Sequence, residues 1–114
     1  MDDERRRRRA GVLKAMGHPS RLAILEAIAG GERCVGDLQA IVGSDLSTVS
    51  RHLAVLKNVG IVGDHKRGQQ VFYRLRFPCV LNFFRCVDAV LGVEGIREIA
   101  PTAADECPLP ARAR

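Results

Sequence analysis

The segment after Asp45 carries hydroxyl, guanidinium, imidazole and ammonium side chains, and no carboxylate lies among them. These polar residues are Ser47, Thr48, Ser50, Arg51, His52 and Lys57. Side chains of these types donate hydrogen bonds to phosphate oxygens and to base edges. A solvated helix face would ordinarily mix Glu or Asp with the cations. The segment therefore favours a contact with nucleic acid over a merely solvated surface.

The spacing of apolar residues predicts that this segment is a helix over 46–58. Leu46, Val49, Leu53 and Leu56 recur at three- or four-residue intervals and form one apolar stripe. Asp45 is a suitable N-cap, because its carboxylate can accept from the free amides of the first turn. We expect the stripe to face a core and Ser47, Thr48 and Arg51 to lie nearest the bases. His52 is expected to meet phosphate or to pack at the helix edge.

The flanking residues predict a winged helix-turn-helix, a mainly α fold with a small β-hairpin. Residues 35–42 read as a short helix, and Gly43-Ser44 gives the tight connection to the second helix. Residues 61–66 and 69–75 are β-prone runs with Arg67-Gly68 as the expected turn. Lys66 and Arg67 would bring cations from this wing to a phosphate or a minor groove.

Three successive stretches resemble the signatures of the ArsR/SmtB metalloregulatory repressors. They are GHPSRLAIL at 17–25, CVGDL at 34–38 and STVSRHLAVL at 47–56, and the similarity covers roughly residues 8–92. The resemblance implies a homodimeric repressor that binds double-stranded operator DNA with an inverted repeat. It also implies that the repressor leaves the operator when an inducer occupies its sensing site.

The cysteines indicate what the inducer would be. Cys34 stands where metalloid and heavy-metal sensors of the resembled family carry the first cysteine of a Cys-x-Cys pair, but the second position here is Gly36. Cys79 and Cys86 are the candidates to replace the missing ligand. Thiolate sites select soft ions, so we expect trivalent arsenic, with antimony(III), cadmium(II) and lead(II) as alternatives. No obligatory cofactor is expected.

Helix geometry and the other readings of the cysteines leave several possibilities open. Seven helical residues separate Cys79 from Cys86 by about 10 Å along the axis, so one ion cannot hold both on a regular helix. Cys86 could simply be a small core residue of an apolar helix. Cys107 either joins as a further thiolate or takes no part. Two thiols within disulfide range could instead form a redox or persulfide switch without a metal.

The rest of the chain predicts further helices and a dimer. Helices are expected over 4–16, from Pro19 to Gly30-Gly31, and from Pro78 to about Leu91. The last is apolar almost all round, and a partner subunit is the natural cover. We expect residues 1–100 to form one DNA-binding and dimerisation domain and residues 101–114 a disordered tail.

Composition is consistent with a DNA-binding protein and argues against other classes. The 18 Lys and Arg exceed the 13 Asp and Glu, for a formal charge of +5. Part of this excess is the run Arg5–Arg9, most simply a solvated helix turn beside acidic neighbours, with direct phosphate contact as the alternative.

No segment approaches the roughly 20 apolar residues that span a bilayer, so we expect a cytoplasmic protein without membrane contact. No nucleophile with a base or paired carboxylates stands out, so no enzyme activity is expected.

Overall fold

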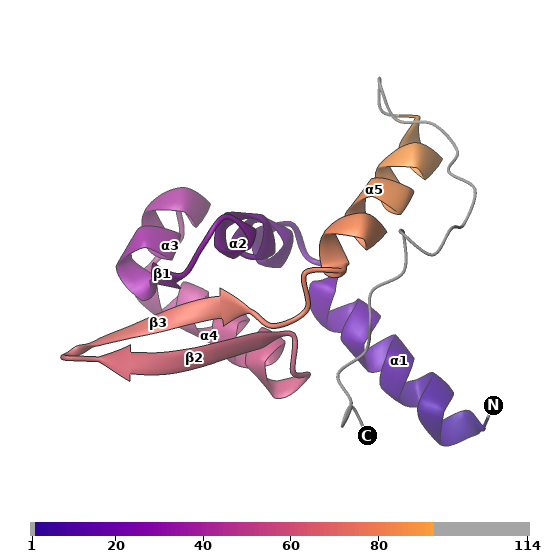
Figure 1. The fold of residues 1–114 in the computed structure, drawn as a ribbon, viewed down its shortest axis with the longest axis horizontal. Helices are drawn as coiled ribbons and strands as arrows, with labels where there is room; N and C mark the ends of the chain where they lie inside the picture. Colours follow the sequence, from indigo (N-terminus) through magenta and orange to yellow (C-terminus); the bar gives the residue numbers. More distant parts are fainter. Residues whose placement is uncertain (1, 93–114) are drawn as a thin grey trace. The chain divides into compact units, whose positions relative to one another are not determined.

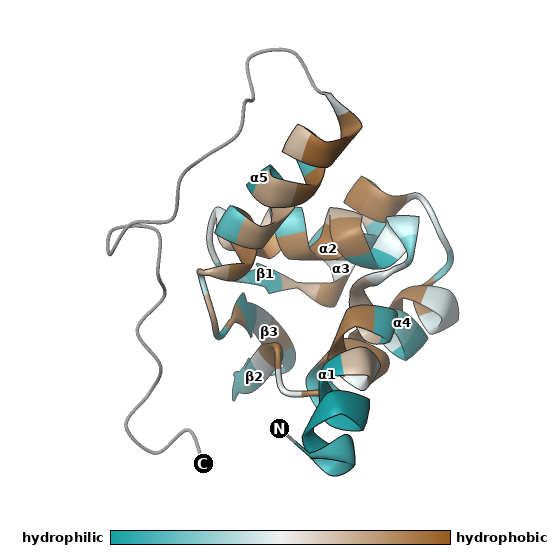
Figure 2. Ribbon diagram, turned by 90° about the vertical axis from the view of Figure 1, so that its right-hand side faces the viewer, coloured by the Kyte–Doolittle hydropathy of each residue, from teal (hydrophilic) through white to brown (hydrophobic). Residues whose placement is uncertain are grey.

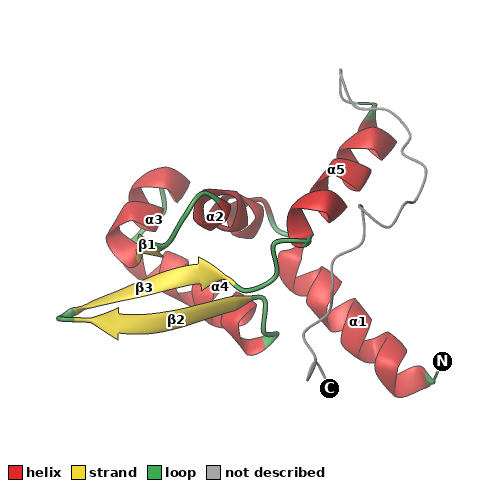
Figure 3. Ribbon diagram, in the orientation of Figure 1, coloured by secondary structure: helices red, strands yellow, loops and turns green. Residues whose placement is uncertain are grey.

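The computed structural model describes residues 2–92 of the 114-residue chain. The elements in chain order are α1 Asp3–Met16, α2 Pro19–Ala29, β1 Arg33–Cys34, α3 Val35–Val42, α4 Leu46–Asn58, β2 Val62–Arg67, β3 Gln70–Leu75 and α5 Val80–Leu91 (Figure 1). The chain separates into two compact units, Met1–Arg76 and a second that begins at Phe77. The winged helix-turn-helix predicted from the sequence is confirmed within the first unit (Figure 3).

Local signals place the helix ends close to the predicted residues. The Asp45 carboxylate accepts a hydrogen bond from the Thr48 amide at 2.8 Å and so caps α4. Hydrogen bonds from Thr48 and then Ser47 hold the pKa of Asp45 below its ordinary value. Pro19 begins α2 where its missing amide has no structural cost. Gly43 ends α3 in the left-handed region, with φ of 80°, which a glycine adopts without strain.

One buried layer joins α2, α3 and α4. Its members are Ile24, Leu25 and Ile28 of α2, Leu38 of α3, and Val49, Leu53 and Leu56 of α4, all at most 3% exposed. Figure 2 shows hydrophobic residues, in brown, along the ribbons of these helices and the hydrophilic first turns of α1 in teal. Burial of these side chains stabilises the packing of the three helices. The core therefore fixes which face of α4 remains in solvent.

The buried face of α4 differs from the predicted stripe at two positions. Leu46 is 50% exposed, and His52 is only 9% exposed. The expectation that Leu46 lies on the core stripe is therefore wrong. The buried positions are 49, 52, 53 and 56, which is the i, i+3, i+4, i+7 pattern of a helix face. Residue 46 lies at the border of that face, so its side chain reaches solvent although it is apolar.

A polar junction around His52 joins α4 to the end of α1 and the start of α2. The Nδ1 atom of His52 accepts a hydrogen bond from Nε of Arg21 at 3.2 Å. Arg21 also donates through Nη1 to the Ala15 carbonyl at 2.9 Å. The ring of His18 lies 4.5 Å from that of His52, and its Nδ1 accepts from the Ser20 amide at 3.1 Å. A neutral His52 ring satisfies this geometry, because Arg21 needs an unprotonated Nδ1.

The sheet holds one more strand than the sequence predicted. Its order is β1-β3-β2, and both pairings are antiparallel. The added strand is the two-residue β1, in which Cys34 pairs with Phe72. The turn of the hairpin is Gly68-Gln69 and not Arg67-Gly68, because Arg67 still pairs with Gln70 in the ladder. Gly68 has φ of 62°, as the first central residue of a type II′ turn requires.

In the second unit, α5 begins at Val80, and Pro78 and Cys79 form the turn before it. The helix was expected to begin at Pro78. Five of its apolar residues are exposed: Leu81, Phe83, Val87, Val90 and Leu91. That a partner subunit covers these residues stays a prediction.

The proposed tail at 101–114 lies outside the described residues. No helix over residues 2–92 is both long and apolar enough to cross a membrane.

A matched pair of substitutions on α4 tests the observed burial. Leu53→Ala should lower the free energy of unfolding by about 2–5 kcal/mol, because it leaves a cavity in the core. Leu46→Ala should change it by less than about 1 kcal/mol, because that side chain is half in solvent. Urea titration followed by circular dichroism measures both. Equal losses would mean that Leu46 is as buried as the sequence stripe predicted.

Acid should destabilise the fold through His52. Burial, followed by the nearby charges of His18, Arg21 and Arg51, holds the pKa of His52 below its ordinary value of 6.5. Because the folded-state pKa is the lower one, the stabilisation is present above pH 6.5 and is lost as pH falls below it. Urea titrations between about pH 7 and about pH 5 should show this loss, and His52→Gln should reduce it. The same pH dependence in both proteins would assign the effect to another group.

Candidate nucleic-acid interface

The exposed face of α4 carries the side chains best placed to meet DNA. Ser47, Ser50 and Arg51 are exposed, and Thr48 is half-buried beside them. Ser47 donates its hydroxyl hydrogen to the Asp45 carboxylate at 3.1 Å, so its oxygen remains able to accept. Arg51 makes no hydrogen bond or ion pair with any residue that the structure describes. The core thus leaves a guanidinium and two hydroxyls together on one open helix face.

His52 does not belong to this face, so its predicted placement among the exposed polar residues is corrected. Its ring is buried in the junction with His18 and Arg21. Of the two expectations for His52, packing at the helix edge is the nearer one, although the ring lies deeper than an edge position. Helical periodicity could have indicated that His52 is buried, because positions 52 and 53 lie on either side of the centre of the stripe formed by residues 49–56.

The two wing cations differ in their surroundings. Lys66 is exposed and has no ion pair among residues 2–92. Arg67 donates from Nη2 to Glu32 Oε1 at 2.8 Å, and its guanidinium carbon lies 4.1 Å from the centre of the Phe72 ring. Sequence reasoning missed Glu32 and Phe72. Glu32 is 35 residues from Arg67 in the chain, so no local pattern could have paired them.

The arginine run at the start of α1 is partly neutralised within its own helix. Arg6 pairs with Asp3 at 2.8 Å, and Arg7 pairs with Glu4 at 3.5 Å. All four side chains are at least 66% exposed. These contacts agree with a solvated helix turn, and they stabilise little because the ions stay in water.

Of the predicted sensing cysteines, Cys34 lies in the first unit. It is half-buried, ends β1 and precedes α3 without a capping hydrogen bond from its side chain. A Cβ atom added at Gly36 would lie 3.9 Å from Cys34 Sγ. Position 36 is therefore the neighbour from which a second thiolate would have reached the same ion. Its absence leaves Cys34 with one local sulfur fewer than the resembled sensors have.

Cys79 and Cys86 lie in the second unit, where the former is half-buried and the latter exposed. The Cys79 carbonyl accepts from the amides of Asn82 at 3.0 Å and Phe83 at 3.3 Å, so Cys79 already joins the helical ladder. Seven helical residues rise about 10 Å. One ion therefore cannot bind both thiolates in this conformation. No group of three or more His, Cys, Asp or Glu over 2–92 is arranged to hold a metal, and Cys107 lies outside that range.

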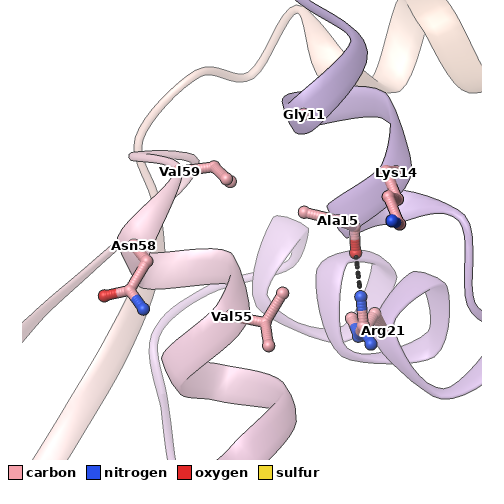
Figure 4. A pocket seen from close by; sticks show the side chains of 7 residues that line it. All are labelled: Gly11, Lys14, Ala15, Arg21, Val55, Asn58 and Val59. Carbon is pink, nitrogen blue, oxygen red and sulfur yellow. Dashed lines mark hydrogen bonds between the residues drawn. The ribbon is translucent and has the colours of Figure 1, made fainter. Parts of the chain in front are cut away.

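A hollow of about 360 Å³ separates α1 from the end of α4 (Figure 4). It is lined by Gly11, Lys14, Ala15, Arg21, Val55, Asn58 and Val59. Figure 4 shows the Arg21 side chain directed to the Ala15 carbonyl at its wall. None of the predicted DNA-contacting residues or cysteines lines it, so it is separate from the exposed face of α4.

Comparison with known proteins finds relatives that are named as transcriptional regulators. Residues 18–63 match the family described as "Bacterial regulatory protein, arsR family". The chain is 35% identical over 96 residues to the HTH-type transcriptional regulator Rv0324 of Mycobacterium tuberculosis, covering 84% of this chain and 42% of that protein. It is also 35% identical over 91 residues to the cadmium resistance transcriptional regulatory protein CadC of Listeria innocua, covering 79% of this chain and 72% of that one. The chain thus spans less than half of the first relative.

Solved structures agree with the fold. The homodimeric winged helix-turn-helix DNA-binding domain of Mb0332 from Mycobacterium bovis matches with a TM-score of 0.69 at 32% identity, covering 81% of this chain and 88% of that domain. Reduced HlyU from Vibrio cholerae matches with a TM-score of 0.67 at 31% identity, covering 77% and 93%. With the observed helix-turn-helix and wing, these similarities show that the chain belongs to the arsR family of bacterial regulatory proteins.

Proposed function

We propose that this protein is a homodimeric transcriptional repressor that binds an inverted-repeat operator and leaves it when a thiophilic inducer occupies its cysteines. The observation that carries the DNA-binding half is the exposed face of α4, with Arg51 unpaired among the described residues beside Ser47 and Ser50. Such a face supplies donors to base edges and phosphates. Membership of a family of bacterial regulators supports the same function.

In this proposal α4 enters the major groove and the wing follows the backbone. The helix begins at Leu46, so its first turns present Ser47, Ser50 and Arg51 where recognition helices contact bases. Lys66 at the wing tip meets phosphate. A two-fold dimer would place two α4 helices about 34 Å apart, one turn of DNA. The homodimeric description of the Mb0332 domain and the exposed apolar side chains of α5 support a dimer.

For the inducer we propose a soft ion bound by thiolates drawn from Cys34, Cys79 and Cys86, either Cys34 with one of the other two or cysteines of two subunits, with trivalent arsenic first and antimony(III), cadmium(II) and lead(II) as alternatives. Cys34 and Cys86 are at least partly accessible, as ligand exchange requires. Sulfur ligands favour ions of this class over hard cations. The similarity to CadC, which is named for cadmium resistance, supports a heavy-metal inducer.

A redox or persulfide response of the same repressor is the second candidate. The absence of a thiol at Gly36 favours it, because a disulfide needs two sulfurs and a trigonal metal site needs three. The similarity to HlyU, whose structure is described as reduced, is in keeping with this candidate. Both candidates use the same cysteines and differ in the reagent that releases DNA.

Substitution of Arg51 tests the DNA face. Arg51→Ala should weaken operator binding at least about tenfold, because it removes a bidentate donor and a charge. Arg51→Lys keeps the charge and should keep the salt dependence but lose discrimination between operator and random DNA. Fluorescence anisotropy with both DNAs, at several salt concentrations, measures these effects. Operator affinity unchanged in both variants would remove Arg51 from the interface.

Substitution of Cys34 tests sensing. Cys34→Ser should leave operator affinity within about twofold, because the residue lies off the exposed face of α4, yet it should abolish release by inducer. The measurement is release of labelled operator during parallel titrations with arsenite, cadmium and a persulfide donor, with free thiols counted at each endpoint. Cys107→Ser, assayed in parallel, shows whether the fourth cysteine takes part in release. Normal release from Cys34→Ser would transfer sensing to Cys79 and Cys86.

Release by arsenite or cadmium, reversed by a competing dithiol, would identify the metal-responsive repressor. Release by the persulfide donor alone, with both metals inert, would identify the redox-responsive one. In each case the number of thiols lost at the endpoint gives the number of sulfurs engaged.

A further inference from the structure

Arg67, a cation of the wing tip, is engaged inside the protein by a carboxylate far away in sequence. Its Nη2 donates to Glu32 Oε1 at 2.8 Å, and the other oxygen of Glu32 lies 3.6 Å from His65 Nδ1. The Arg67 guanidinium also covers the Phe72 ring at 4.1 Å. The charge that should face DNA is thus held against one face of the sheet.

The register of the sheet explains why these side chains meet. Phe72 pairs with Cys34 on one side and with His65 on the other, so the three side chains share a face. Glu32 precedes Cys34 by two residues, and Arg67 follows His65 by two, so alternation brings both to the same face. The short strand β1 is therefore what delivers Glu32 to the wing.

The contact between Glu32 and Arg67 can be broken at little cost in free energy. Their side chains are 35% and 59% exposed, and a pair this open changes an equilibrium by a factor of about one to five. A carboxylate and a DNA phosphate offer arginine the same kind of paired oxygen acceptors. A phosphate near the wing can therefore replace Glu32 without leaving a buried charge unpaired.

We propose that Glu32 is an intramolecular competitor of the DNA backbone for Arg67: it holds the guanidinium on the sheet in free protein and yields it to a phosphate beside the wing tip in the complex. The inference rests on the proposed function, because it needs DNA at the wing. It assigns Glu32 a positioning role that sets operator affinity. Lys66, which has no such carboxylate in the described residues, is not subject to this competition.

The test compares two substitutions that remove the same charge. Glu32→Gln should tighten DNA binding by about two- to fivefold, because Arg67 no longer has to leave a carboxylate, and should keep the slope of log K against log salt, because Arg67 meets a phosphate in both complexes. Glu26→Gln on α2 is the control, since Glu26 is exposed and has no ion pair over residues 2–92. Fluorescence anisotropy with a 20–30 base-pair duplex, after a check of thermal stability, is the readout.

A double substitution separates competition from general charge. In an Arg67→Ala background, Glu32→Gln should have no effect beyond that of Glu26→Gln, because there is no guanidinium left to release. An equal gain for Glu32→Gln and Glu26→Gln, or a gain that persists without Arg67, would overturn the inference while leaving DNA binding intact. If the wild-type protein binds neither operator nor random duplex, the proposed function itself fails.

Discussion

The burial of one face of α4 is the constraint on which the rest of the structure depends. Val49, Leu53 and Leu56 are at most 1% exposed, and they pack with residues of α2 and α3 that are equally enclosed. A helix with 3.6 residues per turn then has no freedom to rotate. Ser47, Ser50 and Arg51 are presented to solvent because the opposite positions are fixed in the core. The surface that we propose faces DNA is therefore a consequence of the packing.

The cations of α4 and its neighbours differ in their partners: Lys57 pairs with the Asp64 carboxylate at 2.9 Å, whereas Arg51 and Arg21 make no ion pair with a described residue. His18, Arg21 and His52 form the junction that joins α4 to α1 and α2, and Arg21 is satisfied by a carbonyl and a ring nitrogen. This arrangement favours a neutral His52. The wing shows the opposite case, because Arg67 has a carboxylate partner in Glu32. The two cationic regions therefore differ in how readily their charge is available to a phosphate.

Much of the fold was predictable because its signals are local. The end of α3 at Gly43 and the cap of α4 at Asp45 depend on residues adjacent in the chain. The hairpin was predicted for the same reason, although its turn moved by one residue because Arg67 still pairs with Gln70. Periodicity predicted the helix over 46–58 correctly but placed its buried face wrongly. Leu46 was assigned to the core because it is apolar, and His52 to the solvent because it is polar.

What the sequence by itself determined was the order of the helices and of the two hairpin strands, the cationic composition of α4 and the positions of the four cysteines. These follow from side-chain chemistry and from interactions within a few residues. Only the tertiary structure decided that His52 is buried by Arg21 and His18, and that Glu32 reaches Arg67 through a two-residue strand. Such contacts join residues about 30 or more positions apart, so only the packing of the folded chain, which no local pattern encodes, brings them together.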